Sequence, residues 1–317
     1  MQIIAIFGIM KLESQLEKIS AFSRLELLAN QIVEGFISGM HKSPFHGFSS
    51  EFAEHKVYNA GESTKNIDWK LYARTDRLYS KRYEEETNLR CHLIIDNSSS
   101  MHYPKLKSGQ QFYESKIGFS VLASAVLMDL LKRQRDAVGL SVYSNSYEYY
   151  APEKGSGRHH RMLLNRLENL LDEPPVAKDT DTTTFLHQIA QKMHRRSMII
   201  LFTDMFQPGN EETLFNALQH LKHDKHKVVL FHVTDRLTEF NFDFDNAPRK
   251  FIDLESGEEV NLFAENVKEE YEKRVAAYFK KVEETCIQYH IRYVPVSVHE
   301  SFEKILTTYL VEKQKFG

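Results

Sequence analysis

Oxygen-bearing side chains alternate along one short stretch of the sequence, HLIIDNSSSMHY at residues 92–103. Asp96, Ser98 and Ser100 follow a largely apolar run that is typical of a buried strand. Carboxylate and hydroxyl oxygens are hard ligands, which suit Mg²⁺, Mn²⁺ or Ca²⁺ better than Zn²⁺. The stretch therefore predicts a divalent-ion site, provided that other parts of the chain supply further ligands.

Two other stretches could complete such a site. Asp204 ends the apolar run in IILFTDMF, and three consecutive threonines, Thr182 to Thr184, precede LHQIAQKM. A simpler alternative is a capped turn, in which Asp96 or Ser100 is the N-cap of a following helix. The elements around these stretches must decide between the two.

Apolar runs of strand length alternate with helical patterns from residue 90 onward. This alternation predicts an α/β fold with a doubly wound, mostly parallel sheet covered by helices on both faces. Such sheets bind ligands at the carboxyl ends of their strands, where Asp96 and Asp204 are expected. The predicted strands are residues 91–96, 137–144, 198–204, 227–235 and 291–298, and the predicted helices are residues 109–134, 161–171, 186–196, 210–223 and 264–289, with a last helix after them.

Two parts of the chain interrupt this alternation. Residues 1–89 precede the first sheet strand and are predicted to form a helix within 11–40 followed by extended segments. Residues 90–317 form the predicted α/β domain, with a hairpin insertion near 240–263 that turns at Ser256-Gly257. The chain is thus expected to contain two domains.

Composition narrows the class of protein. The 317 residues are 42% hydrophobic and 27% charged, with a formal net charge of −3, which does not suggest a dedicated nucleic-acid binder. Cys91 and Cys286 lie far apart without a CxxC motif and fit free thiols in a reducing cytoplasm. The N-terminal apolar run is too short to span a bilayer, so a cytoplasmic protein without a membrane span is expected.

The candidate ligands resemble a known metal site. DNSSSM resembles the DxSxS start of the metal-ion-dependent adhesion site (MIDAS) of von Willebrand factor A-like domains. TTTFLHQIA is similar to the loop that supplies their threonine, although glycines are usual at positions 182 and 183, and IILFTDMF resembles the strand that ends on their second aspartate. The resemblance implies one divalent ion, Mg²⁺ first, held by Asp96, Ser98, Ser100, Thr184 and Asp204.

A longer motif precedes this domain. YNAGESTKNIDWKLYARTDRLYSKRYEEE at residues 58–86 closely resembles the hallmark of the bacterial domain-of-unknown-function family fifty-eight. Members are thought to be adaptors or chaperone-like partners rather than enzymes, and they often accompany MoxR-type AAA+ ATPases. The resemblance therefore implies a protein that binds acidic groups of a partner through its metal ion. The motif residues Gly61, Asp68, Trp69 and Arg74 are expected to be structural, with Trp69 in a core or interdomain pocket.

Two other functions remain open. The same ion could activate water in a hydrolase of phosphate esters, although the loop offers little that could act as a general acid or base, so no catalytic residue is assigned. Alternatively, the metal site is degenerate and the protein is a scaffold that acts through residues 11–90. The histidines suggest no further site: His220, His223 and His226 are expected on a solvated face, and His159-His160 in a loop.

Overall fold

The computed structural model describes residues 24–40, 55–57, 69–81, 89–144, 147–172, 182–205, 215–216, 218–219, 221, 225–245, 247–252, 254 and 259–315. The chain divides into two compact units. One unit comprises residues 1–33 and 89–316, and the other comprises residues 34–88 with Gly317. The domain boundary at residue 89/90 and the hairpin insertion near 240–263 remain predictions.

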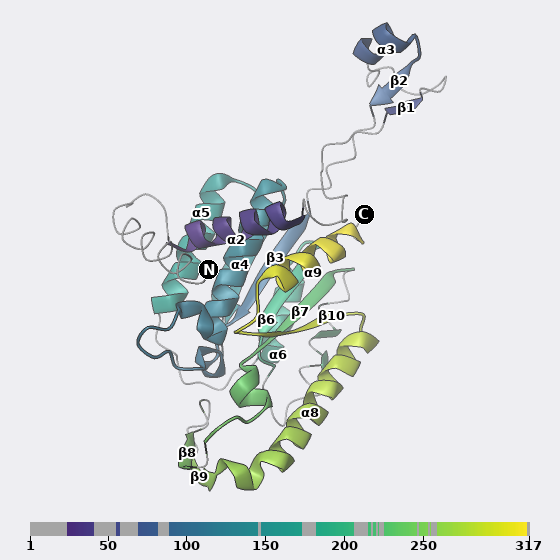
Figure 1. Ribbon diagram of the computed structural model, residues 1–317. Coiled ribbons are helices and arrows are strands. Elements are labelled where there is room, and N and C mark those ends of the chain that lie inside the picture. Colours follow the sequence, from purple (N-terminus) through teal and green to yellow (C-terminus); the bar gives the residue numbers. More distant parts are fainter. Residues whose placement is uncertain are drawn as a thin grey trace. The chain divides into compact units, whose positions relative to one another are not determined.

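A six-stranded sheet forms the centre of the first unit within the described residues (Figure 1). Its strand order is β10-β7-β6-β3-β4-β5, and all neighbours are parallel except β4 and β5. The chain proceeds outward from β3 to β5 and then continues from β6 on the other side of β3, so the order reverses between β3 and β6. The strands are β3 (Arg90–Asp96), β4 (Ala137–Tyr143), β5 (Tyr147–Lys154), β6 (Met198–Thr203), β7 (Lys227–Thr234) and β10 (Arg292–Ser297).

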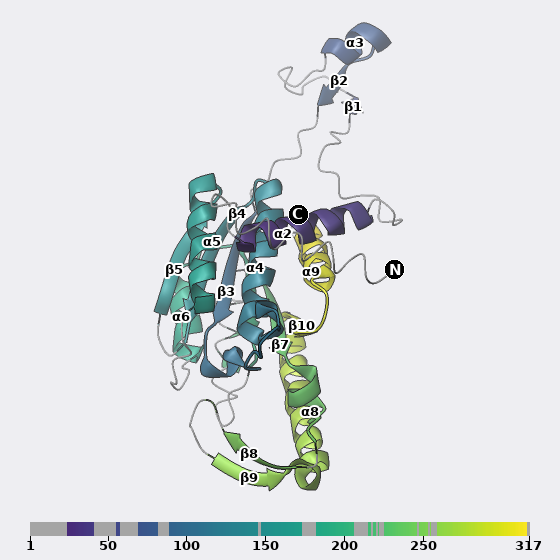
Figure 2. The same ribbon diagram turned by 60° about the vertical axis from the view of Figure 1, so that its left-hand side comes forward.

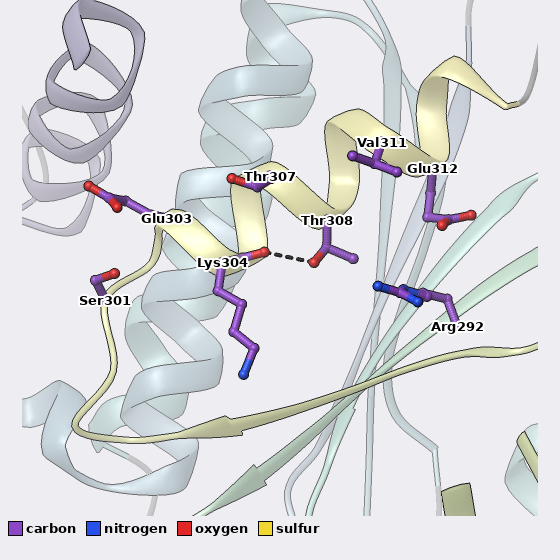
Figure 3. A pocket seen from close by; sticks show the side chains of 8 residues that line it. All are labelled: Arg292, Ser301, Glu303, Lys304, Thr307, Thr308, Val311 and Glu312. Carbon is purple, nitrogen blue, oxygen red and sulfur yellow. Dashed lines mark hydrogen bonds between the residues drawn. The ribbon is translucent and has the colours of Figure 1, made fainter. Parts of the chain in front are cut away.

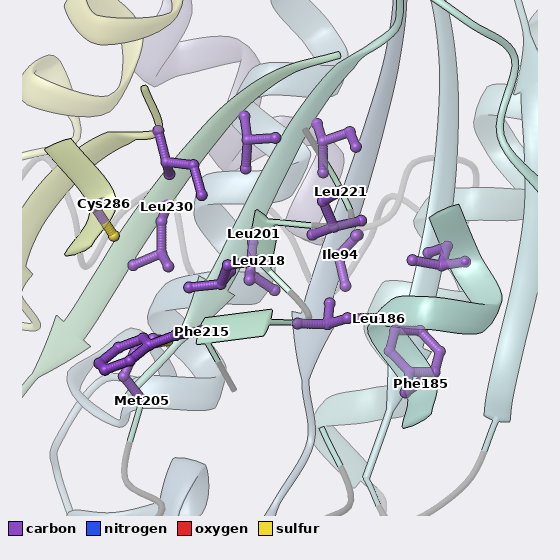
Figure 4. Packing of buried hydrophobic residues seen from close by; sticks show 14 of the residues in the cluster. Ile94, Phe185, Leu186, Leu201, Met205, Phe215, Leu218, Leu221, Leu230 and Cys286 are labelled. Carbon is purple, nitrogen blue, oxygen red and sulfur yellow. The ribbon is translucent and has the colours of Figure 1, made fainter. Parts of the chain in front are cut away.

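Helices cover both faces of this sheet. On one face α4 packs against β3, β4 and β7 and also contacts α5 and α9 (Figure 2). On the other face, residues of α6 and α8 form a buried apolar cluster with Ile94 and Leu201 of the central strands (Figure 4). The predicted fold class, a doubly wound and mostly parallel sheet with helices on both faces, is confirmed. The helices are α4 (Lys116–Arg133), α5 (Gly157–Asp172), α6 (Thr182–Lys192), α8 (Ala264–Gln288) and α9 (Glu303–Gln314).

The central strands are buried along nearly their whole length because both faces of the sheet are covered. In β3, all residues after Arg90 are buried, and Leu93, Ile94 and Ile95 are 0% exposed. Fully burying each such side chain stabilises the fold by about 1.5–3 kcal/mol. The buried polar ends of β3 and β6 are therefore held in place by a rigid, well-packed sheet.

The start of α4 is fixed by a tight approach between two backbone segments. The hydroxyl of Ser115, the N-cap, accepts a hydrogen bond from the Gly118 amide at 3.2 Å. A Cβ on Gly118 would lie 1.9 Å from the carbonyl oxygen of Phe112, in the 3₁₀ turn η3 (Phe112–Glu114), so only glycine fits here. This packing sets the position of Lys116, the first residue of α4.

Shorter elements complete the described structure. In the first unit, π-helix η4 (Arg236–Phe240) follows β7, and β8 (Pro248–Ile252) pairs antiparallel with β9 (Glu259–Phe263), where the sequence predicts a hairpin. In the second unit, β1 (His55–Val57) pairs antiparallel with β2 (Tyr79–Lys81), and α3 (Trp69–Thr75) lies between them in the chain. Helix α2 (Arg24–Met40) lies where a leading helix is predicted and buries Leu25, Ala29 and Val33.

The structure differs from the predicted elements in several places. The helix predicted from residue 109 begins at Lys116, because η3 and its tight approach to Gly118 occupy the preceding residues. Strand β5 was not predicted, since its residues YEYYAPEK are largely polar or amphipathic at a sheet edge. His159 and His160 lie buried in α5 rather than in a loop, and the His159 ring contacts the Val138 carbonyl oxygen at 2.9 Å.

No described helix combines the length and the apolar character that crossing a bilayer requires.

Candidate metal centre

The two candidate aspartates lie at adjacent strand ends in the middle of the sheet. Strands β3 and β6 are parallel neighbours, with Ile95 opposite Phe202, so Asp96 ends β3 beside the end of β6. The hydroxyl of Thr203 donates to Asp96 Oδ2 at 2.8 Å, and Asp204 follows Thr203 directly. The strand order reverses at this point, which is where open α/β sheets bind ligands.

Asp96 is held by several donors. Its Oδ1 accepts a hydrogen bond from the Ser98 amide at 2.9 Å. Its Oδ2 accepts from Thr203 and also from the hydroxyl of Tyr143 at 3.2 Å. A carboxylate has about four lone-pair positions, so these three bonds fix Asp96 and leave its Oδ1 with acceptor capacity.

The two serines of the loop point their hydroxyls at each other. Ser98 Oγ and Ser100 Oγ are 3.0 Å apart, just beyond the end of β3. Ser98 is the N-cap of the four-residue 3₁₀ helix η2 (Ser99–His102), but its side chain makes no capping hydrogen bond. Neither Asp96 nor Ser100 is the N-cap, so the capped-turn alternative does not account for these side chains.

The predicted fifth ligand is placed only by its backbone. Thr184 lies in the first turn of α6, but its side chain and those of Thr182 and Thr183 lie outside what the structure describes. Thr184 thus remains a predicted ligand.

A lysine that the sequence did not single out lies against the second aspartate. Lys116 Nζ is 2.8 Å from Asp204 Oδ2 and 2.5 Å from Glu239 Oε1. The lysine side chain is 1% exposed, and that of Asp204 is 5% exposed. Glu239 lies on η4, and its Oε2 accepts from the Asp235 amide at 2.7 Å. The acidic cluster therefore contains its own cation.

These contacts shift the ionisation of the cluster. Burial raises the pKa of Asp96 to about 6, and the neighbouring carboxylate of Asp204 adds to the rise. Burial lowers the pKa of Lys116, but its contacts with Asp204 and Glu239 outweigh this and hold the pKa above its ordinary value. Burial also raises the pKa of Glu239, and the charge of Lys116 opposes that rise. The three carboxyl groups of the cluster thus carry more negative charge, when ionised, than the single ammonium of Lys116 neutralises.

The backbone carbonyl groups of Asp204 and Met205 are also held by hydrogen bonds. Burial lowers the pKa of His232 to about 4, so its imidazole is neutral at pH 7. Because a carbonyl only accepts, His232 Nε2 donates to the Asp204 backbone oxygen at 2.9 Å, and Nδ1 accepts from the Tyr293 hydroxyl at 2.6 Å. Tyr278 donates in the same way to the Met205 carbonyl oxygen. The end of β6 is therefore held by β7 and α8, and β10 orients the histidine.

The donor set fits a hard divalent ion. Asp96 and Asp204 supply carboxylates, and Ser98 and Ser100 supply neutral hydroxyls, as Mg²⁺ prefers. No cluster of three or more His, Cys, Asp or Glu side chains suited to a metal occurs within the described residues, so such a site depends on the hydroxyls. An ion held there would supply charge neutralisation and a coordination position for a ligand.

A second buried cluster has the connectivity of a hydrolase triad. His92 Nε2 is 2.7 Å from Ser141 Oγ, and His92 Nδ1 is 2.6 Å from Glu153 Oε1. These residues lie on the neighbouring strands β3, β4 and β5. His92 and Ser141 are 0% exposed, and the Glu153 side chain is 1% exposed, so no substrate reaches the serine. The cluster therefore anchors the edge strand β5 to the sheet.

Several other predicted residues lie apart from this centre or outside the described structure. Gly61 and Asp68 are outside the described residues, as is the side chain of Trp69, while Arg74 is exposed on α3. His226 is buried and accepts from the Ser197 amide at 3.2 Å, so the prediction of a solvated histidine there was wrong. The missed signal was its position at the start of an apolar strand.

A hollow of about 400 Å³ lies beside α9, and neither candidate aspartate lines it (Figure 3). Its charged lining residues are Arg292, Glu303, Lys304 and Glu312. Lys304 Nζ is engaged by the Pro295 carbonyl oxygen and by Glu300. The mixed signs favour neither an anion nor a cation at this position.

Residues 54–281 match the family described as protein of unknown function DUF58. Among curated proteins, the chain is similar to "Uncharacterized protein Rv1480" of Mycobacterium tuberculosis and "Uncharacterized protein Mb1516" of Mycobacterium bovis. Each is 23% identical over 216 residues, which is 68% of this chain and 65% of the relative. The chain thus matches less than two thirds of the length of these relatives.

Two solved structures are also similar. The conserved hypothetical protein BatB from Bacteroides thetaiotaomicron has a TM-score of 0.44 and 14% identity, covering 72% of this chain and 99% of BatB. The SpRpn10 VWA domain has a TM-score of 0.37 and 13% identity, covering 69% of this chain and 94% of that domain. At these values no function is transferred from either structure.

Proposed function

Because the chain belongs to the DUF58 family of proteins of unknown function, we propose from its site that it is a non-enzymatic adaptor or chaperone-like protein. A divalent ion, Mg²⁺ first and Mn²⁺ or Ca²⁺ as alternatives, is held by Asp96, Ser98, Ser100, Thr184 and Asp204. The ion bridges to an acidic group of a protein partner.

One observation carries this proposal. Two buried carboxylates end adjacent parallel strands at the point where the strand order reverses, with two serine hydroxyls 3.0 Å apart in the same loop. Burial and, second to it, the neighbouring carboxylate of Asp204 raise the pKa of Asp96, so two ionised carboxylates are unfavourable here in the absence of further positive charge. A divalent ion would neutralise both, and neutral hydroxyls would leave it able to accept a carboxylate from a partner.

Titration calorimetry with MgCl₂ and MnCl₂ tests the ion. We expect wild type to bind one ion per chain and Asp96→Ala to lose at least tenfold in affinity, because one of two charged ligands is gone. Glu153→Gln is a matched control, since it changes a buried carboxylate on a neighbouring strand away from the centre. Equal affinity in wild type and Asp96→Ala would contradict the site.

A pull-down from the native cell with and without EDTA tests the partner. We expect a partner that is retained with Mg²⁺ and released by chelator, and a MoxR-type AAA+ ATPase is the proposed candidate. Asp96→Ala should lose the same partner. Capture that is unchanged by chelator and by Asp96→Ala would instead favour a scaffold acting through residues 11–90.

The alternative of a phosphate-ester hydrolase makes a different prediction. It requires Mg²⁺-dependent turnover of p-nitrophenyl phosphate or a nucleotide that disappears in Asp204→Ala. We expect no turnover above the buffer rate, because the side chains around the aspartates are hydroxyls and an ion-paired lysine rather than a poised general base.

A further inference from the structure

The buried ammonium of Lys116 raises a question about how a metal ion could bind beside it. Lys116 Nζ contacts Asp204 Oδ2 at 2.8 Å, and Asp204 is one of the two proposed charged ligands. An ammonium and a divalent ion at the same carboxylate repel each other, strongly so where water is excluded. Lys116 therefore competes with the metal for Asp204.

Glu239 offers Lys116 a second acceptor that is not a proposed ligand. Its Oε1 lies 2.5 Å from Lys116 Nζ, so the ammonium is shared between two carboxylates. Glu239 is itself fixed, because its Oε2 accepts from the Asp235 amide and its backbone oxygen accepts from Tyr271 of α8 at 2.9 Å. An ammonium that leaves Asp204 therefore still has a rigidly held counter-charge.

Charge accounting connects the two states. With a divalent ion present, the ion neutralises Asp96 and Asp204 while Lys116 neutralises Glu239. Without it, the ammonium of Lys116 lies against Asp204 and Glu239, while Asp96 lies beside the same strand end. Lys116 can therefore move from Asp204 to Glu239 when the ion binds, and the ion is the only charge that enters or leaves the site.

We propose that Lys116 is a resident counter-cation of this site, which neutralises Asp204 when no metal is bound and is retained by Glu239 when a divalent ion binds. Lys116 and Glu239 are positioning residues that set the affinity for the ion. This inference rests on the proposed function, since it concerns regulation of the same site.

Opposite changes in metal affinity test the exchange. Lys116→Met removes the competing charge, so Mg²⁺ and Mn²⁺ should bind at least tenfold more tightly by titration calorimetry. Glu239→Gln removes the second acceptor and leaves the ammonium on Asp204, so affinity should fall at least threefold. Lys116→Met should also melt at a lower temperature in EDTA and recover most of that loss in Mg²⁺.

Lys313→Met is the matched control. Lys313 pairs with buried Asp136 at the other end of β4, so this change also strands a buried carboxylate, but Mg²⁺ should not restore its melting temperature. If Lys116→Met does not fold in EDTA, purification in Mg²⁺ and the Glu239→Gln titration still decide the question. Unchanged or weaker affinity in Lys116→Met, or unchanged affinity in Glu239→Gln, overturns the inference.

The outcomes also separate this inference from the proposed function. Ion binding by wild type with no change in Lys116→Met overturns the role of Lys116 and leaves the metal site standing. Binding by Lys116→Met but not by wild type supports the counter-cation and contradicts a metal-bridged wild type. Binding by neither overturns both.

Discussion

Asp96 shows how a buried side chain acquires chemistry from its neighbours. Its carboxylate receives hydrogen bonds from the Ser98 amide and from the hydroxyls of Thr203 and Tyr143. Those bonds favour the charged form of Asp96, whereas burial and the charge of Asp204 disfavour it. Burial and Asp204 outweigh the hydrogen bonds, so the pKa of Asp96 is raised to about 6. A cation that binds beside the two carboxylates therefore stabilises their ionised forms.

A buried histidine elsewhere makes stability depend on pH. His160 of α5 is 2% exposed, and neither ring nitrogen has a hydrogen-bond partner within the described residues. Burial lowers its pKa from 6.5 to about 4, and the charges of Lys132 and His159 add to this while Asp129 opposes it. Between these two pH values the unfolded chain binds a proton that the folded protein does not, so stability falls as the pH drops from 6.5 toward 4.

His160→Leu should remove that loss. A pKa difference of this size corresponds to at most about 3 kcal/mol of unfolding free energy, at 1.36 kcal/mol per unit. We therefore expect the variant to retain up to about 3 kcal/mol more stability than wild type at pH 4, and to match it within about 1 kcal/mol at pH 7.5. Urea denaturation across this range measures the difference.

The control for this prediction is His194→Gln, a change at an exposed histidine. The stability difference between this variant and wild type should change much less with pH than the difference for His160→Leu. Parallel pH profiles for His160→Leu and wild type would show that His160 protonates as readily in the folded protein as in the unfolded chain.

The start of α4 shows how an element positions the site. Helix α4 carries Lys116 at its first residue, and that residue is placed by the Ser115 cap and by the approach of η3 to Gly118. The Lys116 amide also donates to the Tyr103 carbonyl oxygen at 2.9 Å, which ties the helix to the loop after η2. Changes in this contact should therefore move the ammonium as well as weaken the fold.

Gly118→Ala should destabilise the protein although alanine is the better helix former. Its Cβ would lie 1.9 Å from the Phe112 carbonyl oxygen, so η3 must shift, and overpacking of this kind costs about 1–3 kcal/mol. Gly157→Ala on α5 is the matched control, because a Cβ there meets nothing within 4 Å. We expect that change to be neutral or stabilising by up to about 1 kcal/mol in denaturant unfolding. Equal unfolding free energies for the two variants would contradict the tight approach.

In the first unit, several elements converge on one end of the sheet. Asp96 comes from β3, Asp204 follows β6, Lys116 begins α4 and Glu239 lies on η4. An ion bound there would connect these elements, and the folded state alone brings them together. Metal binding should therefore stabilise the whole unit by mass action rather than one loop.

Thermal unfolding with and without Mg²⁺ measures that coupling. At a Mg²⁺ concentration of 100 times the dissociation constant, the expected gain is about 2.7 kcal/mol. For a unit of this size the melting temperature should rise by about 5–10 °C relative to EDTA. Asp96→Ala should show at most about half of this rise at the same Mg²⁺ concentration. A wild-type melting temperature that is independent of Mg²⁺ would contradict binding to the folded state.

The alternation of apolar runs was sufficient to predict the α/β fold and the placement of Asp96 and Asp204 at strand ends, because burial on both faces leaves a local pattern in each central strand. The same pattern did not predict β5, whose pairing at the sheet edge rests partly on the His92–Glu153 contact across the sheet. Edge strands bury less apolar surface and so leave a weaker signal.

The charge balance of the candidate centre depends on contacts that no local pattern records. Lys116 meets Asp204 across 88 residues and Glu239 across 123 residues of sequence. In the sequence, Lys116 is one lysine at a helix start and Glu239 one acid after a strand, and each type is ordinarily solvated. The parallel pairing of β3 with β6 and the packing of α4 and η4 over their ends bury both groups together, which turns a pair of aspartates into a site with its own cation.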